Sequence, residues 1–235
     1  FASAAAPDAV YWNGLGKMVQ TYLRKVPDVV IVPDFPPPHT ISGYNLEIPQ
    51  SETDHYRFVG PIFDRDPSAV ALEKETIFAS FGGEPFKLPL YAMLREIADE
   101  MPDLRFEVFS TTPGLPESTE NFQTFGYVPA LQPYLAKSRA AILHGGLTSL
   151  MEALSFGKPV VMIIDPYHPE QWNNARKIEE MSAGIMIRGD AVTREKLRDA
   201  IRQAVSLTPP DLREMFSSVN GRESVRTILE ELHTA

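Results

Sequence analysis

The stretch from His144 to Glu152 combines residue types that suit the binding of an anion. It reads His-Gly-Gly-Leu-Thr-Ser-Leu-Met-Glu and follows the apolar run 140–143. Two adjacent glycines let the backbone turn tightly and come close to a ligand. The N–H groups of a first helical turn and the positive end of the helix dipole then favour a phosphate. The candidate phosphate-binding residues are His144, Gly145, Gly146, Thr148 and Ser149.

Apolar spacing predicts that this motif joins a strand to a helix. Residues 140–143 form a short apolar run typical of a buried strand. The next apolar residues recur at positions i, i+3, i+4 and i+7, as on one face of a helix. These residues are Leu147, Leu150, Met151 and Leu154. Glu152 lies one turn beyond the phosphate-binding residues, where its carboxylate can accept hydrogen bonds from sugar hydroxyls. The alternative interpretation is a capped core helix behind a glycine turn.

Apolar runs that alternate with helical patterns predict a parallel α/β sheet after residue 75. The expected strands are 76–80, 104–109, 122–125, 140–143, 159–164 and 184–187. In such a sheet, ligands bind in the crevice beyond the carboxyl ends of the strands. Four loops with glycine and polar residues fall at that edge, and together they indicate a ligand site more strongly than any one alone. These loops are 80–83, 126–129, 144–149 and 165–174.

Two of these loops add candidate residues for the two ends of a nucleotide ligand. The ring of Tyr127 can stack on a planar base and the backbone of Val128 can pair with a base edge, although core packing would explain both residues equally well. Glu170 and Gln171 can bind adjacent sugar hydroxyls, with Asn174 as a further amide. The alternative for Glu170 is a helix start that simply places an acidic residue near the dipole.

The loop at Ser80, Gly82 and Gly83 matches no complete nucleotide motif. It lacks the Gly-Lys-Ser/Thr ending of a P-loop and is not a full GxGxxG. Hydride transfer with a dinucleotide is therefore disfavoured. No Ser-His-Asp arrangement can be identified either, because the hydroxyl of Ser149 in a first helical turn is better explained as an anion donor.

The residues before 75 are expected to form a separate unit. Patterns predict a helix over 15–26, a buried strand at 29–32, irregular chain over 44–55, a short strand at 56–59 and a linker over 62–72. The chain begins with Phe1 rather than Met and has no signal-peptide pattern, so we expect it to be a fragment of a longer protein.

Composition excludes several classes of function. The 235 residues carry a net charge of −9, which argues against a nucleic-acid binder, and include no cysteine for disulfides or thiolate chemistry. No apolar run has the length of a membrane span. The five histidines show no paired spacing, so no metal site is expected.

The motifs resemble the donor-binding half of GT-B nucleotide-sugar glycosyltransferases, most closely the UDP-glycosyltransferases and the family of the lipid II transferase. The resemblance spans about 76–187 and consists of several motifs in the same order. The motifs are Gly126-Tyr127-Val128-Pro129, His144-Gly145-Gly146-x-Thr148-Ser149-x-x-Glu152, Gly157-x-Pro159 and Glu170-Gln171-x-x-Asn174-Ala175. The Trp and Gln of plant-type members are absent, as is their Asn at the Thr148 position, so the branch and the donor stay open.

The resemblance implies a role for each matched residue. The uracil is bordered by Tyr127 and Val128, and the ribose is bound by Glu152. The donor sugar is bound by Glu170 and Gln171. The diphosphate contacts His144, Gly146, Thr148 and Ser149, with Ser80, Gly82 and Gly83 nearby.

The implied fold is α/β of GT-B type. A Rossmann-like donor domain with a parallel sheet and the C-terminal helices would occupy 66–235, after the end of an N-terminal Rossmann-like acceptor domain and a linker at 1–65. The implied reaction moves a hexose or N-acetylhexosamine from a UDP-sugar, or another nucleotide sugar, to an unidentified acceptor, which is a lipid, a glycan or a small molecule.

The resemblance also implies what accompanies the reaction. No metal or cofactor is needed because the nucleotide sugar is a substrate, and the catalytic base is expected in a missing N-terminal part. A cytoplasmic location is implied, with peripheral membrane association through that missing part as an alternative. The alternative functions are a nucleotide-sugar hydrolase or 2-epimerase, or the donor-binding subunit of a split transferase.

Overall fold

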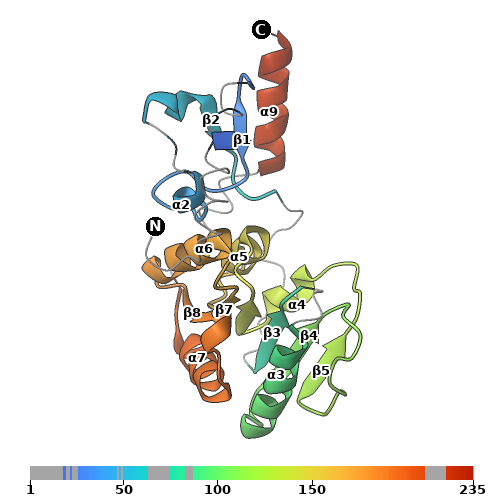
Figure 1. Cartoon of the computed structure of the whole chain (residues 1–235). Coiled ribbons are helices and arrows are strands. Elements are labelled where there is room, and N and C mark those ends of the chain that lie inside the picture. Colours follow the sequence, from blue (N-terminus) through green and yellow to red (C-terminus); the bar gives the residue numbers. More distant parts are fainter. Residues whose placement is uncertain are drawn as a thin grey trace.

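The computed structural model describes residues 18, 19, 22, 26–46, 48, 50–62, 75–82, 87–209 and 221–234. The predicted helix over 15–26 and the predicted linker over 62–72 fall largely outside these residues. Gly83 and the helical segment expected before Asn220 fall outside them entirely. The larger part of the described chain, residues 75–82 and 87–209, contains a parallel sheet of six strands in the order β5-β4-β3-β6-β7-β8 (Figure 1).

All six predicted strands of this sheet are confirmed. They are β3 (Thr76–Ser80), β4 (Arg105–Phe109), β5 (Phe122–Phe125), β6 (Ala140–Leu143), β7 (Val160–Ile164) and β8 (Gly184–Arg188). The chain runs outward from β3 to β5 and then returns to place β6 on the other side of β3. Ser80 is therefore the register partner of Leu143. This reversal of strand order is where an open α/β sheet forms its ligand crevice.

Helices cover both faces of the sheet. They are α3 (Leu88–Glu100), α4 (Gln132–Lys137), α5 (Leu147–Ser155), α6 (Pro169–Glu180) and α7 (Arg194–Ser206). One face packs against α3 and α7, through buried Leu94 and Leu197 among others. The opposite face packs against α4, α5 and α6, through Leu135, Leu150 and Ile178. Apolar helix faces on both sides explain why the central strands are continuous apolar runs.

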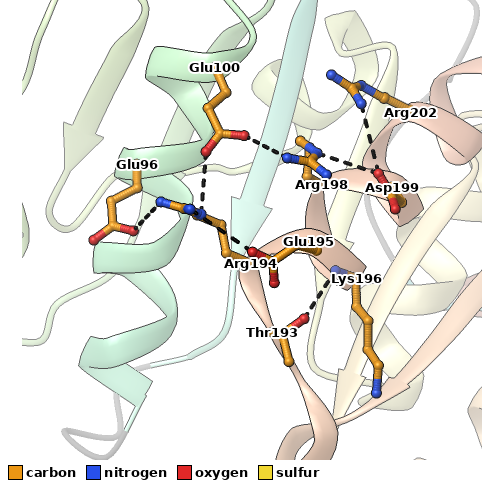
Figure 2. Close-up of polar contacts among 9 residues, drawn as sticks. All are labelled: Glu96, Glu100, Thr193, Arg194, Glu195, Lys196, Arg198, Asp199 and Arg202. Atoms are coloured by element: carbon orange, nitrogen blue, oxygen red, sulfur yellow. Dashed lines mark hydrogen bonds and ion pairs between the residues drawn. The ribbon is translucent and has the colours of Figure 1, made fainter.

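Ion pairs join α3 and α7 along their exposed sides (Figure 2). Arg194 lies 3.4 Å from Glu96 and 3.3 Å from Glu100, and Arg198 lies 2.9 Å from Glu100. Exposed pairs of this kind stabilise a fold only weakly, but Glu100 is shared by two arginines and so links the pairs into a network. The network adds polar contacts between two helices that the buried apolar residues already hold on one face of the sheet.

Local sequence signals account for where several helices begin and end. The hydroxyl of Thr193 accepts a hydrogen bond from the backbone N–H of Lys196 at 3.2 Å and so caps the start of α7. Pro169 stands in the first turn of α6, where its missing N–H costs nothing. Gly157 has φ +65° just after α5, the left-handed conformation that commonly ends a helix.

The smaller described part holds two parallel strands, β1 (Val30–Val32) and β2 (Tyr56–Phe58), which confirms both predictions there. The prediction of irregular chain over 44–55 is wrong. That segment contains α2 (Gly43–Leu46) and a 3-10 helix, η1 (Gln50–His55). The physical reason is that two parallel strands need a crossover, and helical turns satisfy the backbone along it.

The last described helix, α9 (Gly221–Thr234), returns to this smaller part. Figure 1 draws it beside β1 and β2. A Cβ atom placed on Gly221 would lie 2.5 Å from the carbonyl oxygen of Pro61, so the start of α9 touches the chain just after β2. The division of the chain near residue 65 stays a prediction. None of the helices described is both long and apolar enough to cross a bilayer.

Candidate functional site

A cavity of about 1150 Å³ opens at the carboxyl ends of β6, β7 and β8. The starts of α3, α5 and α6 contribute to its wall. Of the predicted site residues, those that line it are His144, Gly146, Thr148, Ser149, Glu170 and Gln171. Two loops predicted independently of each other, 144–149 and 165–174, are therefore brought together at one site.

The turn between β6 and α5 is shaped by its two glycines, of which Gly145 has the left-handed conformation. Gly145 has φ +83°, and a Cβ atom there would lie 3.0 Å from Cγ2 of Ile164 and 3.2 Å from Cβ of Gln171. A Cβ atom on Gly146 would lie 2.7 Å from Nε2 of His144. The imidazole ring therefore packs against the backbone at the start of α5, in the cavity wall.

The start of α5 has hydrogen-bond donors available for a ligand. Gly146 is the N-cap residue, and none of the described side chains caps this helix. The first helical bond of the backbone runs from the N–H of Leu150 to the carbonyl of Gly146 at 3.1 Å. The N–H groups before Leu150 thus have no acceptor within the helix. With the hydroxyls of Thr148 and Ser149 beside them, they form a site suited to an anion.

The start of α6 is organised by its own side chains. Nδ1 of His168 accepts from the N–H of Gln171 at 3.5 Å, a long capping bond. The amide oxygen of Gln171 accepts from the N–H of Asp165 at 2.9 Å, which closes the loop after β7. Glu170 is exposed in the first turn. The carboxylate of Glu170 is therefore accessible to a ligand, whereas Gln171 is already held in place.

Three predicted residues, Tyr127, Val128 and Glu152, are not among those that line the cavity. Oε1 of Glu152 accepts from Nε2 of Gln132 at 2.9 Å, so its carboxylate faces the start of α4. Tyr127 is 82% exposed, while Val128 packs against the core on that face of the sheet. The carboxylate of Glu152 thus faces α4, whereas Glu170 lines the cavity.

The first predicted loop adjoins the cavity without lining it. Ser80 ends β3 and is half-buried. The carbonyl of Gly82 accepts from the hydroxyl of Tyr91 at 3.2 Å and from that of Ser110 at 3.3 Å. Gly83 lies outside the described residues. The loop is thus tied to α3 and to the end of β4, and a ligand role for it stays a prediction.

Asn174 takes a different position from the one expected of a ligand residue. It is fully buried, and its amide group donates to the carbonyl of Gly145 at 3.1 Å. Its oxygen accepts from Nδ2 of Asn45, in α2, at 2.9 Å. Both ends of the side chain are therefore bound by protein, behind the glycine turn.

Sequence reasoning missed several residues of the cavity wall. Asp190 lies there with Gly189, just after β8, and this edge position was the signal that could have identified them. The guanidinium of Arg188 hydrogen-bonds the carboxyl of Asp190 at 2.7 Å and holds its pKa below the usual range. Lys87 also lines the cavity and donates to the carbonyl of Phe81, and no sequence signal marked it.

No cluster of three or more possible metal ligands occurs in the part of the chain that the structure describes. The cavity wall carries backbone N–H groups, hydroxyls, the imidazoles of His144 and His168 and the ammonium group of Lys87, and at its α6 and β8 side also the carboxylates of Asp165, Glu170 and Asp190. Donors of these types suit an anionic ligand such as a diphosphate.

Comparison with protein families identifies one match. The sequence model of the Glycosyltransferase family 28 C-terminal domain matches residues 104–231, which is more than half of the chain. An uncharacterized glycosyltransferase of Methanosarcina acetivorans is 30% identical over 233 residues, which cover 92% of this chain and 59% of that protein. The NDP-glycosyltransferase YjiC of Bacillus licheniformis is 32% identical over 66% of this chain and 42% of its own length.

Solved structures share the fold. The calicheamicin glycosyltransferase superposes with a TM-score of 0.65 at 19% identity, covering 95% of this chain and 60% of its own. A spinosyn rhamnosyltransferase complexed with thymidine diphosphate has the same TM-score at 18% identity, covering 86% and 57%. The expected GT-B fold is confirmed, and the chain spans between about two fifths and three fifths of the length of these relatives.

Proposed function

This chain belongs to the family of the Glycosyltransferase family 28 C-terminal domain, and from that premise we propose that it binds the nucleotide-sugar donor of a glycosyltransferase. The observation that carries the proposal is the start of α5. An uncapped helix start with two adjacent hydroxyls lines a cavity at the point where the strand order reverses. A diphosphate has the charge and the acceptor atoms that such a site binds.

We further propose that the donor is a UDP-sugar carrying a hexose or N-acetylhexosamine. The diphosphate would lie at Gly146, Thr148 and Ser149, and the sugar would extend into the cavity toward Glu170. The base and ribose would extend the other way, past α5 toward Tyr127. The thymidine diphosphate bound by the rhamnosyltransferase makes dTDP-sugars the first alternative.

The reaction then follows from charge development on the donor. A bond forms between an acceptor hydroxyl oxygen and the anomeric carbon while the bond from that carbon to the diphosphate breaks. Negative charge grows on the leaving diphosphate, where the N–H groups of α5 stabilise it without reorganising. The acceptor hydroxyl loses its proton to a general base. We expect this base in the acceptor domain, not among the donor-site residues.

Titration calorimetry with UDP, GDP and dTDP tests the proposal. We expect one of them to bind, and Ser149→Ala and Glu152→Ala each to weaken it by about 1.5–3 kcal/mol, the value of a hydrogen bond to a charged group. Ser206→Ala is the matched control, because that hydroxyl only donates to the carbonyl of Arg202. A wild-type chain that binds none of the three diphosphates would contradict the proposal.

Product analysis separates transfer from related chemistry. Incubation with a UDP-sugar in the absence of acceptor should leave the sugar intact. Release of free sugar would instead identify a hydrolase, and conversion to a second UDP-sugar would identify an epimerase. Binding without turnover, restored by a separate acceptor protein, would identify a donor-binding subunit.

A further inference from the structure

Three asparagines connect α2 to the glycine turn of the cavity. The side chain of Asn174 donates to the carbonyl of Gly145 at 3.1 Å and accepts from that of Asn45 at 2.9 Å. The oxygen of Asn45 in turn accepts from Nδ2 of Asn173 at 2.7 Å. The relay joins residues about 130 positions apart in the sequence, and Figure 1 shows α2 lying against α6, where these contacts occur.

Hydrogen-bond chemistry fixes the direction of this relay. A backbone carbonyl can only accept, so Asn174 must present its NH₂ group to Gly145. The oxygen of Asn174 then faces α2 and requires a donor, which Asn45 supplies. The remaining oxygen of Asn45 is satisfied by Asn173. Reversing any one amide would place two acceptors or two donors against each other.

Burial makes the relay costly to disrupt. Asn174 is 0% exposed and Asn173 is 6% exposed, so water cannot easily replace a lost partner. Leaving a buried polar group without its hydrogen bond destabilises the fold by the full desolvation penalty of that group. The orientation of Asn174 is therefore dictated by protein groups, including one from α2.

The start of α2 is itself held by a buried carboxylate. Asp34, which is 0% exposed, accepts from the N–H of Ser42 at 2.7 Å and from its hydroxyl at 2.6 Å. Asp34 also accepts from the N–H of Ile41 at 3.2 Å. Asn45 is thus presented from a segment whose backbone is fixed just after β1.

We propose that Asn45 and Asn174 are positioning residues that orient the phosphate-binding turn. The C=O and N–H of a trans peptide point in opposite directions. Because Asn174 holds the carbonyl of Gly145, the N–H of Gly146 points away from the side chain of Asn174, at a residue that lines the cavity. The segment around α2 thereby sets the geometry of the donor site. This inference rests on the proposed function for its ligand, but not for its contacts.

Variants of Asn45 test the relay, with Tyr44→Phe as the matched control. Tyr44 neighbours Asn45 and contacts α6 through an exposed hydrogen bond to Glu180 at 2.8 Å, but does not touch Asn174. In Asn45→Ala we expect the amide NMR signals of Gly145 and Gly146 to shift, and the affinity for UDP or dTDP to fall about 3- to 10-fold, as for one lost hydrogen bond. In Tyr44→Phe both should stay as in the wild type.

The variant Asn45→Asp sharpens the test because it keeps the shape of the side chain, replaces the donor NH₂ group with an acceptor oxygen and adds a negative charge. Its second oxygen would face the oxygen of Asn174, so its effect should equal or exceed that of Asn45→Ala. Unshifted glycine signals and unchanged affinity in both folded variants would overturn the inference. If the wild-type chain binds none of UDP, GDP and dTDP but Asn45→Ala still shifts the glycine signals, the proposed function is overturned and the relay is not.

Discussion

The starts of α5 and α6 face the same cavity and are built in opposite ways. The start of α5 has no side-chain cap and presents backbone N–H groups from behind a glycine turn. The start of α6 has Pro169 in its first turn, a capping bond from His168 and an acidic residue, Glu170. The first arrangement attracts an anion, whereas the second has already neutralised its helix end. The difference supports the proposal that a phosphate would bind at α5, with side chains of α6 left for the sugar.

The largest predicted effect comes from removing the turn that keeps α5 open. Gly145→Ala would force a Cβ atom into a left-handed conformation and against Ile164 and Gln171. We expect a loss of about 2–4 kcal/mol in the free energy of unfolding, from backbone strain plus overpacking. Nucleoside diphosphate binding should fall below detection in calorimetry.

Two other glycines separate the contributions to that loss. Gly157→Ala introduces a positive-φ strain with no atom within 4 Å, so it should cost about 1 kcal/mol. Gly126→Ala meets no atom within 4 Å at a residue without positive φ and should leave stability unchanged. Urea unfolding of the three variants checks the order, and equal stabilities would refute the assigned role of the turn.

The next effect comes from giving α5 the acidic first turn that α6 already has. Ser149→Asp places a carboxylate near the helix dipole, which should raise stability by about 0.3–1 kcal/mol. The same charge repels a diphosphate and competes for the N–H groups, so affinity should fall at least about tenfold. The unfolding temperature should therefore rise while the diphosphate affinity measured by calorimetry falls. A variant that binds the diphosphate as the wild type does would contradict an anion site at the start of α5.

A smaller effect is expected from removing the side-chain cap at the start of α6. His168→Ala removes the capping bond, and the cost should be about 0.5 kcal/mol, the low end for a cap, because the bond is 3.5 Å long. Diphosphate affinity should change little, since the N–H groups of α5 are untouched. Urea unfolding and calorimetry provide the two measurements, and a large loss of diphosphate affinity would break the proposed division of labour.

The smallest predicted effect distinguishes a residue that binds the donor sugar from one that binds the diphosphate. Glu170→Gln keeps the shape of the side chain and removes its charge. We expect the affinity for a UDP-sugar to fall about threefold, within the range for one weakened hydrogen bond, and the affinity for UDP itself to stay the same. Competition binding with both ligands measures the ratio. Equal losses for both would place Glu170 at the phosphate instead.

Much of the sheet and the turn before α5 was predictable because the signals are local. Apolar runs marked every strand from β3 to β8, and the spacing from Leu147 to Leu154 marked the buried face of α5. The crossover between β1 and β2 was not predictable, because α2 begins where the carboxylate of Asp34 accepts from Ser42. That bond depends on a turn of the chain, not on periodicity.

The amino-acid sequence by itself determined which loops gather at one sheet edge, since parallel strands of fixed direction must end there together. It also determined that Gly145 and Gly146 precede an amphipathic helix. Only the tertiary structure decided where the nearby side chains point. Asn174 turns inward to Gly145 because Asn45, far away in the sequence, completes its hydrogen bonds. Glu152 faces Gln132 because α4 packs beside α5. Such pairings depend on contacts between distant segments, which no local pattern records.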